Sequence, residues 1–171
     1  MSNLLVIMTE QEFDKKLQKA KVLFDEKINA DSEKSVPFAN YIASKKSGNT
    51  IYISGQLPRD LLNENKVITG KADNNDNIFD AKYASAMCAM QVLLVLKNEI
   101  GDLKKVKSCI QLQVFVNSSP DFINQHLVAN GASDLVCEYL EKSVAQHTRC
   151  AVGVATLPLG ALVEVGAVFE I

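Results

Sequence analysis

The longest regular pattern in the chain is helical, and it limits what the remaining residues can form. Between residues 76 and 99, apolar side chains recur every three to four positions, which is the spacing of one face of an α-helix. Asp76 is a suitable N-cap for this helix and Gly101 a suitable C-terminal stop. Because 171 residues is the usual size of one domain, we expect the helix to cover a sheet. The side chains on its apolar face are Ile78, Ala81, Ala84, Cys88, Val92 and Val95.

A second helix is predicted near the N-terminus. Thr9 and Glu12 form a capping-box pattern, which marks the start of a helix. Apolar residues then follow at helical spacing, namely Phe13, Leu17, Ala20, Phe24 and Ile28. This amphipathic pattern predicts a helix on the surface of the domain.

Three strands are predicted between the two helices. Residues 40–44 and 50–57 have the character of strands, and the turn-forming residues 47–49 between them predict a hairpin. Pro58 and the polar run 63–66 end the second strand before a third, short strand at 67–71. Together these strands are expected to form a small meander.

A further strand and a helical region are predicted after the long helix. The strand covers residues 106–116, and a helical region opens at Ser119-Pro120 and ends near Leu140, with a break at Asn130-Gly131. One side of the strand is expected to be buried, because apolar and polar residues alternate along it. The apolar residues are Ile110, Leu112, Val114 and Val116, and the polar ones are Gln111 and Gln113.

Two strands are predicted to end the chain, at residues 149–157 and 162–171. Pro158-Leu159-Gly160 between them is a turn tripeptide. The complete order, after the N-terminal helix, is β-β-β-α-β-α-β-β, so the predicted class is α+β, with helices on one face of the sheet. Residues 1–36 form an N-terminal helical extension packed on the domain, and residues 37–171 form the domain itself. The uncovered sheet face predicts a homo-oligomer.

Composition argues against several kinds of protein. The net charge is -2, from 18 basic and 20 acidic side chains, so a nucleic-acid surface is not indicated. The apolar runs are short for a membrane span, and the N-terminus lacks the basic region of a signal peptide, which predicts a cytoplasmic protein. The four cysteines are expected to be buried free thiols: Cys88, Cys109, Cys137 and Cys150.

Strong catalytic and cofactor motifs are absent from the sequence. The chain has no GxxxxGK[ST], GxGxxG, HExxH, CxxC or GxSxG pattern. His126 and His147 are the only histidines, and neither has a cysteine or carboxylate at the spacing of metal ligands. We therefore expect no metal and no cofactor, and we interpret both histidines as surface or helix-end residues.

Arg149 is the first candidate site residue. It is the one cation at the start of a strand built otherwise from small and apolar residues. Its guanidinium matches a carboxylate in bidentate fashion, so this residue is suited to bind a small acid. The alternative is a structural salt bridge to one of the protein's own carboxylates.

Glu164 is the second candidate. It lies in an apolar strand with no other charge before Glu170, and a carboxylate there costs desolvation unless it is used or paired. If the last two strands pair directly through their turn, Glu164 faces Ala155, about 20 Å from Arg149. In that case either the hairpin is irregular, or the two residues contribute to sites between subunits.

Two separated motifs resemble the RidA/YjgF family. Residues 149–158, RCAVGVATLP, followed by the strand Val163-Glu164-Val165, resemble the family's C-terminal signature R-x-x-V-x-V-x-x-L-P and V/I-E-V/I. Upstream, residues 54–58, SGQLP, resemble its S-G-Q-[IL]-P segment, and Tyr41 precedes Ser54 by thirteen residues, as the family's pocket tyrosine does. The resemblance covers roughly residues 37–171.

The resemblance implies a chorismate-mutase-like fold and a homotrimer with ligand pockets between subunits. It further implies hydrolysis of reactive enamines and imines of amino-acid metabolism to 2-oxo acids and ammonia, without metal or cofactor. Arg149 matches the arginine that binds the substrate carboxylate, and Glu164 the acid that places or activates water. The remaining matches are to substrate-binding positions: Tyr41, Ser54, Asn130, Ala151 and Pro158.

The sequence also departs from the short members of the family. The chain has about 35 residues before the matching region, and Gln146-His147-Thr148 precedes the arginine where short members often carry Pro-Ala. The alternative functions are a non-catalytic trimer that binds a small carboxylate, an endoribonuclease, and an acyl or carbamate hydrolase.

Overall fold

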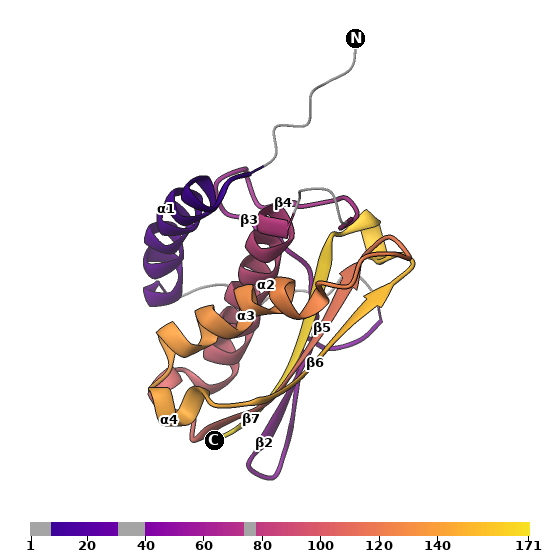
Figure 1. The fold of residues 1–171 in the computed structure, drawn as a ribbon. Helices are drawn as coiled ribbons and strands as arrows, with labels where there is room; N and C mark the ends of the chain where they lie inside the picture. Colours follow the sequence, from indigo (N-terminus) through magenta and orange to yellow (C-terminus); the bar gives the residue numbers. More distant parts are fainter. Residues whose placement is uncertain (1–7, 31–39, 74–77) are drawn as a thin grey trace.

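The computed structural model describes residues 8–30, 40–73 and 78–171. A five-stranded sheet with the order β1-β2-β7-β5-β6 carries helices on one face, and β3 and β4 form a separate two-stranded sheet (Figure 1). The elements are α1 (Glu10–Asn29), β1 (Ser44–Ser47), β2 (Thr50–Gln56), β3 (Arg59–Asp60), β4 (Lys66–Val67), α2 (Ile78–Ile100), η1 (Leu103–Lys105), β5 (Ser108–Asn117), α3 (Gln125–Tyr139), α4 (Lys142–Ala145), β6 (Thr148–Val154), η2 (Pro158–Gly160) and β7 (Val163–Glu170). The predicted α+β class is confirmed.

Helix α2 forms the centre of the core. Most of its residues are buried, between the sheet on one side and α1 and α3 on the others. By length and composition alone α2 is apolar enough to cross a membrane, but 72% of that stretch is buried inside the structure, as in a core helix. The predicted stop is confirmed, since Gly101 follows the helix with φ 82°. The predicted N-cap, Asp76, lies outside the described residues.

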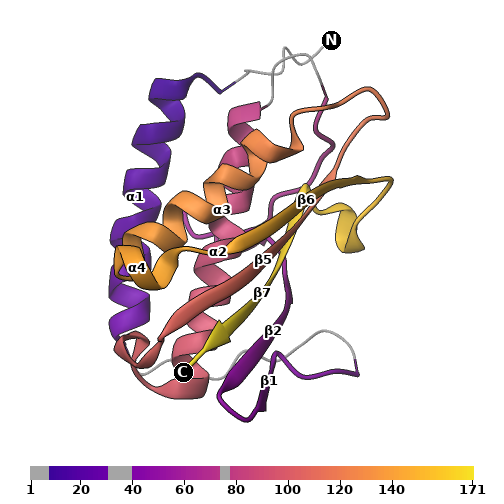
Figure 2. The same ribbon diagram turned by 60° about the horizontal axis from the view of Figure 1, so that its bottom comes forward.

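Helix α1 forms an outer layer on the helical side. Its predicted capping box is present: Glu12 N–H donates to the Thr9 side chain, and the Glu12 carboxylate accepts from Thr9 N–H. Its buried residues are Phe13, Ala20, Phe24 and Ile28. Figure 2 shows α1 beside α2 and α3, with the sheet on their other side. The N-terminal helix is therefore a third layer of the domain.

The first predicted strands differ from the structure in position and pairing. Strand β1 begins at Ser44, later than predicted, and pairs with β2 across a turn in which Gly48 has φ 59°. The third strand expected at 67–71 does not extend a meander. Only its first residue, Val67, lies in a strand, β4, which pairs with β3 in a separate hairpin. In the turn of this hairpin, Glu64 and Asn65 adopt left-handed backbone conformations that reverse the chain.

Strand β5 has the predicted buried side with one exception. Leu112, Val114 and Val116 are buried, but Ile110 is 40% exposed. The reason is a register shift between Cys109 and Gln111 in the pairing with β7. A bulge of this kind interrupts the alternation of side chains between the two faces.

The direct pairing of the last two strands is wrong. Strand β5 lies between them, parallel to β6 and antiparallel to β7. Residues 155–162 therefore cross over the end of β5 instead of forming a tight hairpin. Their turn, η2, contains Leu159 with φ 57° and Gly160 with φ 68°, and Gly160 accepts a backbone hydrogen bond from Gly70.

Helix α3 begins later than predicted and has no break at Asn130-Gly131. Gly131 lies inside the helix, where its missing side chain allows close approach to α2. A Cβ there would overlap the carbonyl oxygen of Lys82. The glycine is thus explained by helix packing rather than by a helix break.

Replacing Gly131 by Ala is expected to lower the free energy of unfolding by about 1–3 kcal/mol or more, the usual cost of overpacking. The clash involves backbone, so α2 and α3 have to move apart. Urea denaturation followed by circular dichroism measures the effect. Cys137→Ala, an exposed change on the same helix, is the control and should stay within about 0.5 kcal/mol of wild type.

The cysteines are free thiols, as predicted, but only two of them are buried. Cys88 and Cys109 lie in the core, whereas Cys137 and Cys150 are exposed. Burial raises the pKa of the Cys88 and Cys109 thiols, which keeps both protonated at neutral pH.

Candidate functional site

Arg149 lies on β6, the edge strand of the sheet, and faces the helices. In the parallel pairing of β5 and β6 it is the partner of Leu112, whose side chain is buried under the helical layer. Paired residues share a face of the sheet. The guanidinium therefore points from the sheet edge toward α3.

The guanidinium of Arg149 is held by uncharged acceptors on α3. Nη1 donates to Asn130 Oδ1 at 3.0 Å and to Ser133 Oγ at 2.9 Å, and Nη2 donates to the carbonyl oxygen of His126 at 3.1 Å. These three bonds use three of the five N–H donors of the group. Within the described part of the chain, Nε–H and one N–H of Nη2 remain, and these two nitrogens border the same edge of the guanidinium.

The structural salt bridge that was the alternative for Arg149 is not found among the described residues. No carboxylate of residues 8–30, 40–73 or 78–171 lies within ion-pair distance of this side chain. Its positive charge is therefore not neutralised by the described part of the protein. The remaining N–H groups of Nε and Nη2 can bind the two oxygens of a carboxylate.

Two side chains that the sequence analysis missed continue this network. Ser133 Oγ lies 2.9 Å from Nε2 of His147, and Nδ1 of His147 lies 2.7 Å from the carbonyl oxygen of Ala145. Ser133 is one turn beyond Asn130 on α3, so helical spacing alone places the two on one face. From the sequence, this spacing could have identified Ser133 as a neighbour of Asn130.

The two other predicted residues of this part of the chain lie at different distances from Arg149. Ala151 is two residues further along β6, on the same face, beside the buried Val114. Pro158 is exposed at the start of η2, beyond the far end of β6. Within one chain, Asn130 and Ala151 are grouped with Arg149, and Pro158 is not.

Glu164 lies on the opposite face of the sheet. Its partner on β5 is Phe115, which alternates with the buried Val114 and Val116 and so points away from the helices. The carboxylate is half-buried, and burial raises the pKa of Glu164 above its ordinary value of 4.5. Such a carboxyl holds a proton more readily than an exposed one does.

Gly55 explains how the Glu164 side chain fits against β2. A Cβ at Gly55 would overlap Oε1 of Glu164, and the register of β2 against β7 shifts between Ile53 and Gln56. The glycine of the SGQLP segment thus leaves room for the carboxylate. The glycine was recognised in the sequence as part of the SGQLP motif. Its contact with Glu164 became clear only from the pairing of β2 with β7.

Replacing Gly55 by Ala is expected to push the Glu164 carboxylate aside. If Glu164 takes part in catalysis, kcat should fall by about 10- to 100-fold, since misplacing a catalytic group by about 1 Å has effects of this size. Steady-state kinetics measures the change. Gly166→Ala on β7 is the control, because a Cβ there makes only ordinary contacts. Equal kcat in Gly55→Ala and wild type would show that the position of the carboxylate does not matter.

Ser54 and Tyr41 lie on the β1–β2 side of the sheet. The Ser54 hydroxyl donates to the carbonyl oxygen of Ile42 at 2.7 Å, and its N–H donates to the carbonyl oxygen of Ala43. These bonds fix the segment that follows Tyr41, whose side chain is 49% exposed. Ser54 thus ties the segment after Tyr41 to β2, the strand that also carries Gly55 beside Glu164.

The predicted site residues thus form two groups that are separated within one chain. Glu164, Phe115 and Val152 are paired side by side on the three neighbouring strands β7, β5 and β6. Arg149 lies three residues from Val152 along β6, which is about 10 Å, and β6 is two strand spacings, about 10 Å, from β7. The expected facing of Glu164 and Ala155 is wrong, because β5 lies between the strands. Arg149 and Glu164 are nevertheless separated, as expected, because their side chains also lie on opposite faces of the sheet.

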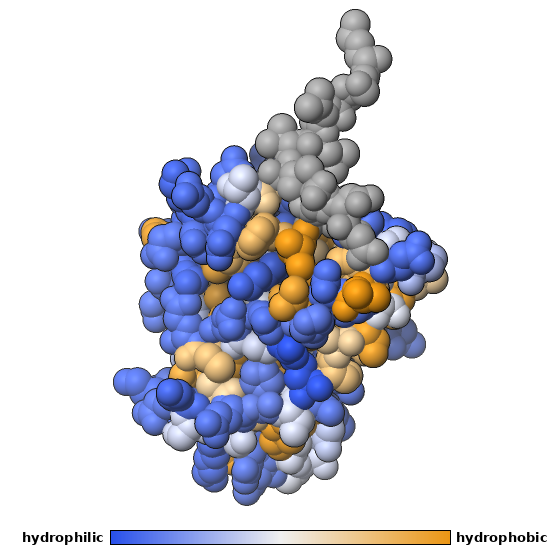
Figure 3. Space-filling model, in the orientation of Figure 1, coloured by the Kyte–Doolittle hydropathy of each residue, from blue (hydrophilic) through white to orange (hydrophobic). Residues whose placement is uncertain are grey.

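The surface near Arg149 includes apolar side chains. Figure 3 shows apolar side chains gathered around the N-terminal end of α3, whereas the surface of α1 is mostly hydrophilic. Ile123, which is 75% exposed, and Leu127 belong to the chain at this end of α3. Their neighbour His126 accepts one of the bonds of Arg149.

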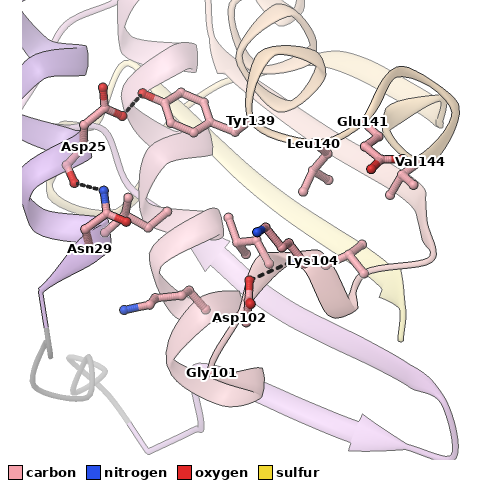
Figure 4. Close-up of a pocket in the computed structure, with 13 residues that line it drawn as sticks. Asp25, Asn29, Gly101, Asp102, Lys104, Tyr139, Leu140, Glu141 and Val144 are labelled. Carbon is pink, nitrogen blue, oxygen red and sulfur yellow. Dashed lines mark hydrogen bonds between the residues drawn. The ribbon is translucent and has the colours of Figure 1, made fainter.

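A groove of about 810 Å³ lies elsewhere, between the C-terminal ends of α1, α2 and α3 (Figure 4). The Tyr139 hydroxyl donates to Asp25 there, at 2.7 Å, and joins α3 to α1. The lining of this groove includes none of the predicted site residues. Among the described residues, no group of His, Cys, Asp or Glu side chains is arranged to hold a metal ion.

The arrangement of strands and helices defines the class of protein: an α+β protein of the chorismate-mutase-like fold. The chain belongs to the endoribonuclease L-PSP family, the RidA/YjgF family of the resemblance, whose model matches residues 32–171. Protein TCP17 of Trypanosoma cruzi is 42% identical over 137 residues, which are 80% of this chain and 84% of that protein.

Two solved structures show the extent of the similarity. A protein of unknown function from Agrobacterium tumefaciens is 36% identical, with a TM-score of 0.73, and the match covers 90% of this chain and 98% of that one. RidA from a Psychrobacter species shares the fold at 23% identity and a TM-score of 0.56, over 81% and 94%. The Agrobacterium structure matches 90% of this chain, which is more residues than the range 32–171 contains. The similarity to that structure therefore extends into the segment that contains α1.

Proposed function

We propose that this protein hydrolyses reactive enamines and imines of amino-acid metabolism to 2-oxo acids and ammonia. The observation that carries the proposal is the guanidinium of Arg149, which is held by uncharged groups and keeps one N–H on each of Nε and Nη2. These donors suit the carboxylate of a small 2-imino acid. Membership of the RidA/YjgF family supports this substrate class.

The chemistry requires few groups. Water adds to the electrophilic imine carbon, the nitrogen takes up a proton, and the resulting carbinolamine loses ammonia as its C–N bond breaks and the C=O bond forms. The protein has to hold the acid group, place the water and move protons. Glu164 suits the last two roles, because burial raises its pKa and brings proton uptake and release closer to neutral pH.

The active unit we propose is a homotrimer in which a second copy completes each site. The Arg149 group and the Glu164 group cannot contact one small acid within a single chain, as their separation shows. The open face of the sheet also exposes apolar side chains, including Tyr52 at 51% and Val152 at 43%. Burial of this face between copies brings apolar area out of water.

The proposal is tested by ammonia release from freshly generated 2-iminopropanoate. Purified protein is expected to accelerate ammonia formation above the spontaneous rate. If the intact protein binds a 2-oxo acid but releases no additional ammonia, the alternative of a non-catalytic carboxylate-binding trimer is correct. The endoribonuclease activity in the name of the family is not favoured by a net charge of -2.

Replacing Glu164 by Gln is expected to lower kcat but to preserve or increase stability at neutral pH. Burial raises the folded-state pKa above 4.5, so at intermediate pH the folded protein keeps a proton that the unfolded chain has released. The stability from this proton is complete below the unfolded pKa and is lost as pH rises through the folded pKa. The variant has no such loss.

Thermal unfolding between pH 4 and pH 8 measures this difference. The melting temperature of the wild type should fall relative to that of Glu164→Gln as pH rises, and the two should converge in acid. If the wild type instead gained stability relative to the variant as pH rises, the surroundings would stabilise the ionised form of Glu164, and the prediction would be wrong.

A further inference from the structure

The segment that distinguishes this chain from short family members, Gln146-His147-Thr148, leads directly into Arg149. In the structure it connects the short helix α4 to the edge strand β6. The Thr148 hydroxyl donates to the carbonyl oxygen of Ile110 at 2.8 Å, which fixes the start of the strand on β5. His147, one residue earlier, is half-buried against α3.

The direction of each hydrogen bond around His147 follows from the groups involved. A carbonyl oxygen only accepts, so Nδ1, 2.7 Å from the Ala145 carbonyl oxygen, carries a hydrogen. In the neutral ring Nε2 is then an acceptor. The Ser133 hydroxyl, 2.9 Å away, donates its one hydrogen to Nε2.

This direction determines what Ser133 offers to Arg149. When the Ser133 hydroxyl donates its hydrogen to His147, both lone pairs of Oγ are free to accept hydrogen bonds. One of them accepts from Nη1 of Arg149 at 2.9 Å. Without the imidazole, a serine inside a helix turns its hydrogen toward the carbonyl oxygen of the preceding turn. The acceptor for the guanidinium would then no longer be fixed.

The geometry points to a relay in which His147 and Ser133 are positioning residues for Arg149. The relay holds the guanidinium of Arg149 against α3 through uncharged groups. The side chain is therefore oriented while its positive charge is not neutralised by these partners. The N–H groups of Nε and Nη2 that α3 does not use stay available for a carboxylate. This inference rests on the proposed function only for the identity of the ligand.

Binding of pyruvate, a short 2-oxo acid, tests the relay independently of turnover. His147→Leu and Ser133→Ala are each expected to raise the Kd of pyruvate, and KM in the ammonia assay, by about 10-fold, with kcat changed little. The loss of one orienting hydrogen bond has an effect of about this size, and the orientation of Arg149 is needed equally in the ground and transition states. His147→Gln places an amide oxygen near the position of Nε2 and should restore most of the affinity.

Two further variants sharpen the test. Ser133→Asp places a carboxylate beside Arg149, and it is expected to abolish pyruvate binding while the protein stays folded. Ser143→Ala removes an exposed hydroxyl on α4 and is the control, with unchanged affinity. Melting temperatures of all variants separate weaker binding from loss of structure.

Nitrogen NMR of the histidines gives a readout that a purely structural role would not move. The relay predicts that His147 is protonated on Nδ1, and that Ser133→Ala changes the Nε2 resonance and broadens that of Arg149 Nε. His147→Leu that binds pyruvate as tightly as wild type, or a ring protonated on Nε2 alone, would overturn the relay. If wild type binds no pyruvate, the proposed ligand class is wrong, and the NMR result alone decides the relay.

Discussion

Replacing Arg149 by Ala lowers kcat/KM for 2-iminopropanoate by an expected 100- to 1000-fold, on the order of 3–4 kcal/mol. The change removes two charge-assisted hydrogen bonds to the substrate carboxylate, each of which contributes about 1.5–3 kcal/mol. Steady-state ammonia release measures the loss. Within residues 8–30, 40–73 and 78–171 the change breaks no ion pair, and the variant is expected to fold.

Arg149→Lys is the matched comparison for this prediction. Lysine keeps the charge but not the planar fork, so it cannot bond Asn130 and Ser133 and also present two parallel donors. We expect kcat/KM to recover only in small part. Activity of Arg149→Lys equal to wild type would show that charge alone is sufficient and that the geometry of the guanidinium has no role.

Replacing Phe24 by Ala lowers the free energy of unfolding by an expected 3–5 kcal/mol, about the cost of removing a buried aromatic ring. Phe24 is fully buried, and its ring meets the edge of the Tyr139 ring at a centroid distance of 4.9 Å. This contact joins α1 to α3. Denaturation in urea, followed by circular dichroism, measures the change.

Val22→Ala is the control on the same helix, because Val22 is 53% exposed. Its effect should remain within about 0.5 kcal/mol. If Phe24→Ala proves as mild as Val22→Ala, α1 is a dispensable attachment and not a layer of the core. The N-terminal helix would then have no part in the stability of the domain.

The helices were predictable because each signal was local. The capping box of Thr9 and Glu12 and the repeated apolar spacing of the two long helices depend on residues close in sequence. Gly131 was misinterpreted for the opposite reason. A glycine that allows α2 and α3 to approach is indistinguishable, in sequence, from one that ends a helix.

The strand order could not be predicted from the sequence. The turn between residues 157 and 162 has the composition of a hairpin, yet β5 enters between β6 and β7. Alternation predicts which residues share a face, but it does not say which strands are neighbours. The expected register of Glu164 was therefore wrong, even though its strand was placed correctly.

The candidate site was predictable only in part. Arg149 and Glu164 stood out as charges in apolar strands, and the structure brings Asn130 to Arg149. Ser133 and His147 were missed because their role depends on distances between α3 and the start of β6. Gly55 was noted only as part of a motif, since its contact with Glu164 follows from the pairing of β2 with β7.

The central claim is that Nε and Nη2 of Arg149 bind the carboxylate of a small acid at a site that a second copy of the chain completes. A crystal structure of the protein grown with pyruvate tests it most directly. The carboxylate should lie on Nε and Nη2 of Arg149, with the Glu164 of a neighbouring copy near the 2-oxo carbon. A bound pyruvate that avoids Arg149, or a site closed by residues of one chain alone, would contradict the claim.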